Sequence, residues 1–283
     1  MTIGVHLGKP LKFAHTLLLG AALALSGCLP APSAEELRAT SDQCSKYRTP
    51  FTRISQERDL RIEAYAKIGS TLGATVGVAI AKQRDENEIA GMLLGALAGA
   101  ALGATSGYLS DLQKRATSTA GLQKAVNGDA SRDLRATDAL IVAMSSLNRC
   151  RLSQIAAVEK SVRAGGDRTA ARATIAQIRR SVDVDNRVIN AVVGDLTRTR
   201  SLYVGALRQT GADTDQFVAS IQQYRPKVSS PQQTSLQVSR AQRPRTTSPV
   251  ANLGYAEKEL SAGAAAHVQR VDSALDDLKE LLI

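Results

Sequence analysis

Residues 167–209, DRTAARATIAQIRRSVDVDNRVINAVVGDLTRTRSLYVGALRQ, contain the most regular hydrophobic repeat of the chain. Five apolar or aromatic residues in this stretch are spaced seven positions apart: Ile175, Val182, Ile189, Leu196 and Tyr203. Ile178, Val192 and Ala206 occupy the intervening core positions. A seven-residue repeat of this length is typical of a helix that packs in a coiled coil. The stretch therefore predicts one long helix, with Asp167 as its N-terminal cap.

The preceding segment, from residue 132 to about residue 164, has a similar repeat and predicts a second helix. The residues that carry this repeat are Leu134, Ile141, Ile155 and Val162, with Met144 and Val158 between them. Gly165 and Gly166 join the two segments and predict a tight turn. Because the turn is short, we expect the two helices to pack against each other in antiparallel orientation.

Polar residues interrupt the apolar stripe of both helices. Asn148 and Arg151 fall at core positions of the first helix, and Asp185 falls at one in the second, with Asp183 nearby. Folding the chain at residues 165 and 166 places 148 near 183 and 151 near 180, within about one helical turn. We expect Arg151 to pair with Asp183 or Asp185 in a polar layer that fixes the register at some cost in stability. The alternative is that these charges turn outward to solvent.

The composition agrees with an all-α fold. The 283 residues include only 3 Phe, 6 Tyr and no Trp, and no segment shows the period-two alternation that strands need. The formal charge of +10 is compatible with an anionic partner. Aromatic residues are too few for the stacking platforms of proteins that bind single-stranded nucleic acid, so no nucleic-acid partner is expected.

Two rows of glycines spaced four apart distinguish residues 68–109. The first row is Gly69, Gly73 and Gly77, and the second is Gly91, Gly95, Gly99, Gly103 and Gly107. Glycine costs a helix about 1 kcal/mol relative to alanine, so the repeated spacing needs a structural reason. Each row leaves a groove that another backbone can enter, as in the GxxxG geometry of membrane helices. With a polar link at residues 82–88, the rows predict an antiparallel helical hairpin.

Part of this hairpin is long and apolar enough for a membrane. Residues 89–109 form 21 uncharged residues, whereas residues 68–81 form only 14, directly after Lys67. A stretch of about 20 apolar residues spans a bilayer, and a shorter partner helix can span with local thinning. We expect the hairpin to insert into a membrane. The alternatives are a soluble Ala/Gly helix pair or a pair buried inside an oligomer.

The N terminus has the pattern of a signal peptide. Lys9 and Lys12 precede an apolar run at residues 13–24, which is too short for an ordinary transmembrane helix. The next four residues, Leu25-Ser26-Gly27-Cys28, resemble the lipobox of bacterial lipoproteins. The resemblance implies that Cys28 is lipidated and becomes the mature N terminus, and Leu29 implies sorting to the outer membrane, facing the periplasm. The alternative is a plain secretory signal in which Cys28 is incidental.

The glycine-rich hairpin resembles that of the small glycine-zipper lipoproteins of the bacterial envelope. The resemblance covers residues 68–109 together with the lipobox, and the rest of the chain is longer than that family usually carries. It implies contact with a lipid membrane through the acylated Cys28. From the glycine spacing, we expect the zipper to pack against further copies of the chain or against other envelope proteins.

Two cysteines, Cys44 and Cys150, remain once Cys28 is set aside. An even pair in an oxidising compartment favours a disulfide. The alternative is a pair of buried thiols, since Cys44 lies on an apolar stripe.

The other helical segments complete the expected organisation. After the signal peptide (1–27), residues 28–67 predict an N-terminal helix or a kinked helix pair, with the break near Thr49-Pro50. Residues 110–225 predict a periplasmic helical region. Within it, Asn127-Gly128-Asp129 predicts a helix end, and residues 211–225 predict a short final helix.

Residues 226–252 have the composition of a disordered basic linker. They contain four prolines and no acidic residue, and their basic residues are Lys227, Arg240, Arg243 and Arg245. Such a linker could contact anionic peptidoglycan or lipid headgroups, and the alternative is a solvated tether.

Residues 253–283 predict a C-terminal amphipathic helix. Its apolar residues are Leu260, Val268, Val271, Leu275, Leu278 and Leu282. We expect this helix to dock onto the other helices, with self-association or binding of a partner as alternatives.

No catalytic or metal-binding motif stands out. His267 is the one histidine after the signal peptide, and its spacing on the last helix favours packing over a role as a base. Asp183-Val-Asp185-Asn186 and Asp213-Thr-Asp215 resemble fragments of metal sites, but they lack the glycine and the terminal glutamate of a calcium loop. We therefore expect no catalytic residue, no bound metal and no cofactor.

These features predict a non-enzymatic, lipid-anchored envelope protein that acts as a structural or assembly scaffold. The zipper and the coiled coil would mediate oligomerisation or partner binding. The alternative is a subunit of an oligomeric secretion, conjugation or export complex, or of a pore. An envelope hydrolase is a third class, and it would need a cleft with clustered titratable groups.

Overall fold

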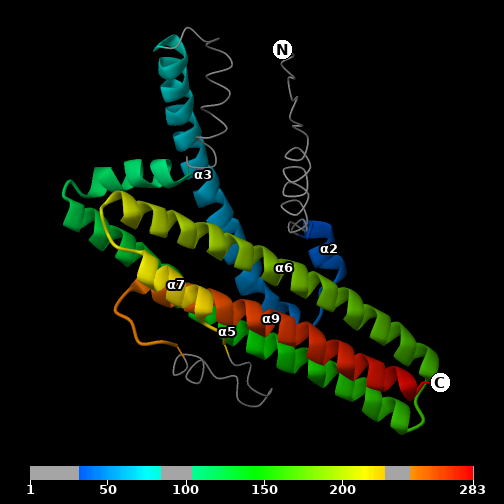
Figure 1. Ribbon diagram of the computed structural model, residues 1–283. Coiled ribbons are helices and arrows are strands. Elements are labelled where there is room, and N and C mark those ends of the chain that lie inside the picture. The colour runs from blue at the N-terminus through cyan, green and yellow to red at the C-terminus, as the bar shows by residue number, and fades with distance from the viewer. Residues whose placement is uncertain (1–31, 84–103, 227–242, 283) are drawn as a thin grey trace, which may run out of the picture.

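The computed structural model describes residues 32–83, 104–226 and 243–282 (Figure 1). For residues 68–83 it describes the backbone only. In these ranges the chain forms helices and connections and contains no strand, which confirms the all-α fold class. The named helices are α2 (Ala34–Ala39), α3 (Ser45–Gln83), α5 (Thr119–Arg163), α6 (Arg168–Gln209), α7 (Asp215–Gln223) and α9 (Pro249–Glu280). Residues 104–115 are also helical. The predicted signal peptide (1–27) and the predicted lipidation site Cys28 lie outside the described residues.

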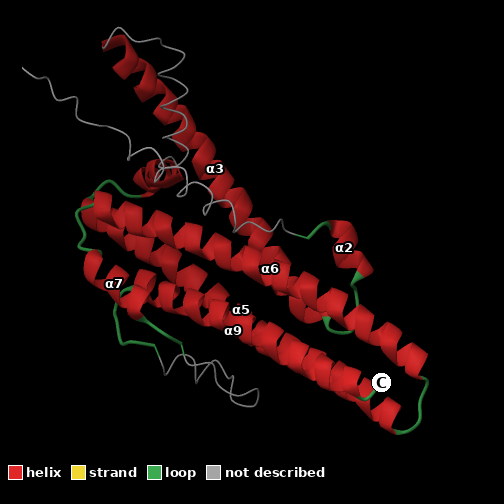
Figure 2. Cartoon of the chain, turned by 45° about the vertical axis from the view of Figure 1, so that its right-hand side comes forward, coloured by secondary structure: helices red, strands yellow, loops and turns green. Residues whose placement is uncertain are grey.

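Three long helices, α5, α6 and α9, lie side by side and form the body of the molecule (Figures 1 and 2). α5 and α6 are antiparallel because the chain reverses at Gly165 and Gly166. Gly165 has a φ of 82°, which residues with a side chain rarely adopt, and its N–H donates to the carbonyl of Val162. Asp167 caps α6 as expected, accepting a hydrogen bond from the N–H of Thr169.

α9 docks against α5 and α6 within the same chain, as the sequence predicts. One core cluster combines Ile155 of α5, Ile175 and Val182 of α6, and Val271 and Leu275 of α9. All five residues of the seven-residue repeat on α6 are buried. α6 contacts α3, α5 and α9, so the region is a multi-helix bundle rather than the two-helix coiled coil that the repeat alone predicts.

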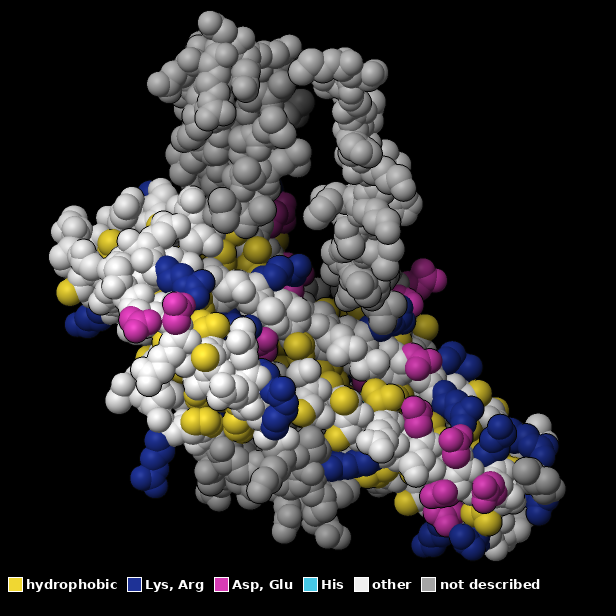
Figure 3. All heavy atoms as spheres, viewed as in Figure 1, with side chains coloured by type: hydrophobic (Ala, Val, Ile, Leu, Met, Phe, Trp, Pro, Cys, Tyr) yellow, Lys and Arg dark blue, Asp and Glu magenta, His cyan; other side chains and the backbone are white. Residues whose placement is uncertain are grey.

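α3 packs its first half against α5 and α6 and then continues away from the bundle (Figure 1). Cys44, at the start of this contact, and Phe51 and Ile54 of α3 are buried there. On the face of the molecule that Figure 3 shows, positive and negative side chains intermingle over the bundle and apolar side chains are scattered.

The break in the N-terminal helix falls at residues 40–44, so its predicted position near Thr49-Pro50 is wrong. Asp42 lies in the break, and its side chain accepts the N–H of Cys44 at 2.9 Å, which starts α3. Pro50 lies inside α3. Near the helix start a proline forfeits one backbone hydrogen bond, which the packing of the neighbouring Phe51 offsets.

The helix end predicted at Asn127-Gly128-Asp129 is also wrong. α5 starts earlier, at Thr119, where the hydroxyl of Ser118 accepts the N–H of Gly121. The helix then runs through Gly128 without interruption. A glycine within a helix costs about 1 kcal/mol, and burial of the neighbouring Val126 and Ala130 offsets that cost.

The linker predicted over residues 226–252 is shorter than expected. Residues 227–242 lie outside the described part, but residues 243–248 are placed against the bundle and α9 begins at Pro249, four residues before the predicted start. Arg243 holds residues 243–248 against the bundle, because its buried side chain forms ion pairs with Asp138 and Glu259. Composition predicts disorder from average polarity and cannot foresee such a specific contact.

The predicted glycine hairpin is described only at its base. Gly69, Gly73 and Gly77 lie on α3, whereas Gly91, Gly95, Gly99 and Gly103 fall outside the described residues. Gly107 lies in the helical segment 104–115, next to α3. Within the described residues, no helix combines the length and the apolar character needed to span a membrane.

Candidate functional site

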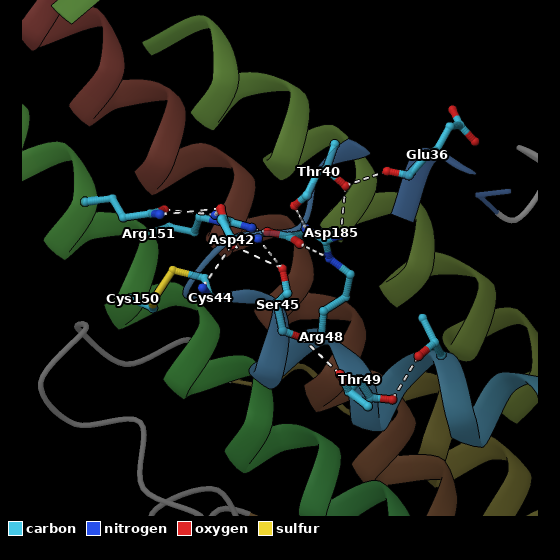
Figure 4. Close-up of polar contacts among 12 residues, drawn as sticks. Glu36, Thr40, Asp42, Cys44, Ser45, Arg48, Thr49, Cys150, Arg151 and Asp185 are labelled. Carbon is cyan, nitrogen blue, oxygen red and sulfur yellow. Dashed lines mark hydrogen bonds and ion pairs between the residues drawn. A yellow bond between two sulfur atoms is a disulfide. The ribbon is translucent and has the colours of Figure 1, made fainter. Parts of the chain in front are cut away.

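A buried layer of charged residues connects α3, α5 and α6 (Figure 4). At its centre the carboxylate of Asp185, on α6, is fully buried. It accepts a hydrogen bond from Nε of Arg48 at 2.6 Å and another from Nε of Arg151 at 2.7 Å. Both arginines are also buried, so three charges are withdrawn from water and depend on one another.

A second carboxylate completes this layer and balances its charge. Asp42, in the connection before α3, accepts a hydrogen bond from Nη1 of Arg151. Burial opposes ionisation of Asp42, but the hydrogen bond and the positive charge of Arg151 outweigh it and lower its pKa. Nη1 of Arg48 donates to the hydroxyl of Thr40 at 2.9 Å. We call Asp42, Arg48, Arg151 and Asp185 the charged layer.

A disulfide between Cys44 and Cys150, with an S–S distance of 2.03 Å, lies beside the charged layer (Figure 4). The pairing is the one that the sequence predicts. Cys150 directly precedes Arg151, and Cys44 lies between Asp42 and Arg48. The covalent bond therefore holds both halves of the charged layer together.

Part of the predicted polar layer is present as expected. Arg151 pairs with Asp185, whereas Asp183 is exposed on the outer side of α6. Asn148 is buried, but its partner is His267 of α9 rather than a residue of α6. Sequence reasoning missed Asp42 and Arg48. The predicted disulfide could have indicated these two residues, because it brings the residues around Cys44 close to those around Cys150.

His267 is a packed side chain, in agreement with its predicted role. Its Nδ1 lies 3.1 Å from Oδ1 of Asn148, and the residue is 1% exposed. Burial lowers the pKa of the imidazole below its usual value of 6.5, so the ring is neutral near pH 7.

The base of the hairpin forms a second cluster, built on three tyrosines. The Tyr108 ring lies between those of Tyr65 and Tyr203, at centroid distances of 5.3 and 5.4 Å. The hydroxyl of Tyr108 donates to Asp129 at 2.8 Å, and that of Tyr203 donates to Asp133 at 2.6 Å. Burial raises the pKa of both hydroxyls, so they remain protonated donors.

Gly107 permits this arrangement. A Cβ atom at Gly107 would lie 2.1 Å from the backbone carbonyl oxygen of Tyr65, closer than any side-chain carbon can approach. α3 and the helical segment 104–115 therefore touch backbone to backbone at this point. We call Tyr65, Gly107, Tyr108 and Tyr203 the hairpin base.

A cavity of about 260 Å³ adjoins the hairpin base. Its charged lining includes Arg115 and Arg132, and both donate hydrogen bonds to the buried Asp129. Arg61, also in the lining, pairs with Asp133 at 3.2 Å. The charges around the cavity are thus largely paired with one another.

A third ion-pair cluster fixes the start of α9. The guanidinium of Arg243 donates through Nη2 to Asp138 of α5 and to Glu259 of α9, each at 2.7 Å. The hydroxyl of Tyr224, at the end of α7, donates to Glu259 at 2.9 Å.

The three clusters link the helices to one another through ion pairs and hydrogen bonds. Within the described part of the chain, no group of His, Cys, Asp and Glu residues is placed to hold a metal ion. Asp213 accepts the N–H of Asp215 at the start of α7, and Asp215 pairs with Arg208, so this motif serves the helix terminus. In each of the three clusters, carboxylates are bound by arginines or tyrosines from other segments of the chain.

Comparison of the chain with protein-family models, with curated proteins and with solved structures found no match. The functional proposal therefore depends on the geometry of the molecule and on its sequence motifs.

Proposed function

We propose that this protein is a non-enzymatic, lipid-anchored component of a bacterial envelope that serves as a structural or assembly scaffold. Acylation at Cys28 attaches it to the outer membrane on the periplasmic side. The helical bundle extends from the membrane as a rigid body, and the glycine-rich hairpin engages further copies of the chain or other envelope proteins.

The hairpin base is the observation that carries this proposal. Tyr108 connects the returning arm to α3 through Tyr65, to α6 through Tyr203 and to α5 through Asp129. Close backbone contact between Gly107 and Tyr65 adds to the packing of residues 104–115 against α3. The described residues on either side of the hairpin tip, α3 and residues 104–115, therefore have a fixed direction relative to the bundle. A fixed direction is useful for an assembly element, because less conformational freedom is lost when a partner binds.

The anchor is tested by replacing Cys28 with alanine in the full-length chain. The unchanged protein is expected in the outer-membrane fraction, whereas the C28A protein is expected to leave that fraction, because it lacks the acyl chains that direct and hold it there. The control is Cys44→Ser/Cys150→Ser, which loses a disulfide and keeps Cys28. If the unchanged protein and the C28A protein fractionate alike, the lipid anchor is refuted.

The second candidate function, a subunit of a secretion or export complex or of a pore, is favoured by the two regular glycine rows. Chemical crosslinking in native membranes separates the two candidates. A ladder that ends at one ring size supports a complex of defined stoichiometry, whereas heterogeneous crosslinks to other proteins support the scaffold.

Gly107→Ala tests the backbone contact at the hairpin base. Because the new methyl group meets the carbonyl oxygen of Tyr65, we expect a loss of about 1–3 kcal/mol in the free energy of unfolding, measured with urea. Gly128→Ala is the matched control, since a Cβ there meets no atom within 4 Å and should stabilise α5 by up to about 1 kcal/mol. Equal effects of the two substitutions would contradict the close approach.

A further inference from the structure

A groove separates α5 from the segment that leads into α9. Its volume is about 530 Å³, and residues 243–246 form one wall. The opposite wall is on α5 and includes Leu134 and Arg135. Asn252, in the first turn of α9, lies at the edge of the groove.

The wall formed by residues 243–246 is held in place by its first residue. The guanidinium of Arg243 is bound by Asp138 and Glu259, and its side chain is only 7% exposed. The side chain of Asn252 supports the same segment, because its Nδ2 donates to the carbonyl of Thr246 at 3.3 Å. The groove is therefore preformed, and a ligand would not have to order this wall.

The available charge in the groove is positive. Asp138 is the acidic residue of the lining, and it is engaged by Arg243. Arg135 and Arg245 are exposed at the groove, and neither makes an ion pair or a side-chain hydrogen bond within the described residues. Two guanidinium groups without a partner among the described residues match a ligand with carboxylate groups, which arginine binds in bidentate geometry.

The groove also lies on the side of the bundle away from the proposed anchor. α2 and the outgoing part of α3 lie on one side of the bundle, and the segment that leads into α9 lies on the other (Figures 1 and 2). Only residues 29–33 separate Cys28 from α2, so even a fully extended connection spans about 20 Å. With Cys28 in the bilayer, α2 stays near the membrane and the groove faces away from it.

We propose that this groove binds a carboxylate-bearing glycopeptide of the cell wall, namely the peptide stems of peptidoglycan, through Arg135 and Arg245. The inference rests on the proposed location in the periplasm. It locates a cell-wall contact in a structured groove beside the linker, at the far side of the bundle from the membrane.

The test is co-sedimentation of the detergent-solubilised full-length protein with purified peptidoglycan sacculi. We expect the unchanged protein to pellet and the apparent affinity to fall about tenfold or more in R135Q/R245Q, because two charged hydrogen-bond donors are lost. The matched control is R149Q/R180Q, which removes the same charge from exposed positions on α5 and α6. Its binding should stay close to that of the unchanged protein. Sacculi whose carboxylates have been converted to amides should not pellet the unchanged protein.

Three results would overturn the proposal. They are no binding of the unchanged protein to sacculi, equal losses in the two double variants, and unchanged binding to the amidated sacculi. The experiment also tests vesicles that contain phosphatidylglycerol. If the protein binds these vesicles in preference to sacculi, and this binding depends on Arg135 and Arg245, the groove is assigned to lipid phosphate instead. Because the assay uses purified protein, its failure leaves the fractionation test of the lipid anchor unaffected.

Discussion

Replacing Asp185 with alanine is expected to lower the free energy of unfolding by about 3–5 kcal/mol, measured by urea denaturation at pH 7. The carboxylate is fully buried and is the shared acceptor of Arg48 and Arg151. Its removal leaves two buried guanidinium groups with one remaining acidic partner in the charged layer, Asp42, which pairs with Arg151. An unpaired buried charge is among the most destabilising changes that a single substitution can cause.

Asp183→Ala is the matched control for this experiment. Asp183 lies two residues before Asp185 on the same helix and is exposed, so its loss should change the free energy of unfolding by no more than about 0.5 kcal/mol. If the two alanine variants unfold at the same urea concentration, Asp185 does not hold the charged layer together. A triple replacement of Arg48, Arg151 and Asp185 by apolar residues of similar volume should be less damaging than Asp185→Ala, because no buried charge is then left without its partner.

Loss of the Cys44–Cys150 disulfide is expected to destabilise the protein by about 2–5 kcal/mol. The bond joins residues 106 positions apart, so it restricts a long loop of the unfolded chain. It also fixes the segment that contains Asp42 and Arg48 against Arg151, and part of the loss should appear as weakened packing of α3. Thermal unfolding of Cys44→Ser/Cys150→Ser, compared with the unchanged protein, measures the effect.

Reductant provides the internal control for the disulfide. It should lower the melting temperature of the unchanged protein towards that of the double serine variant, and it should leave the variant itself unchanged. Thiol labelling under denaturing conditions gives an independent readout. Free thiols at Cys44 and Cys150 in the non-reduced protein would refute the bond.

Several elements follow directly from local sequence patterns. The repeat through Ile175, Val182 and Ile189 predicts α6 and its buried stripe, and Gly165-Gly166 predicts the reversal into an antiparallel pair. Both succeed because helical periodicity and the backbone freedom of glycine depend on neighbouring residues alone. Local turn signals were less reliable where packing opposed them, as at Gly128, which α5 passes through.

The charged layer was foreseen only for its Arg151–Asp185 pair. Arg151 lies on α5 and Asp185 on α6, and a short turn joins these two helices. The pairing of positions could therefore be counted from residues 165 and 166. Arg48 and Asp42 come from a segment more than 100 positions away in the chain, and no periodic pattern relates them to α6. Arg243 was missed for a similar reason, since it lies in a stretch whose composition indicates disorder.

The sequence by itself therefore determined the helical class, the faces that are buried, the antiparallel α5–α6 pair and the two cysteines available for a bond. Only the tertiary structure decided that α9 shares the seam of α6, that Arg48 and Arg151 converge on one carboxylate, and that Arg243 orders the segment before α9. The physical reason is that periodicity records which side of a helix avoids water. The choice among partners depends on the shapes and charges of segments that meet only when the chain is folded.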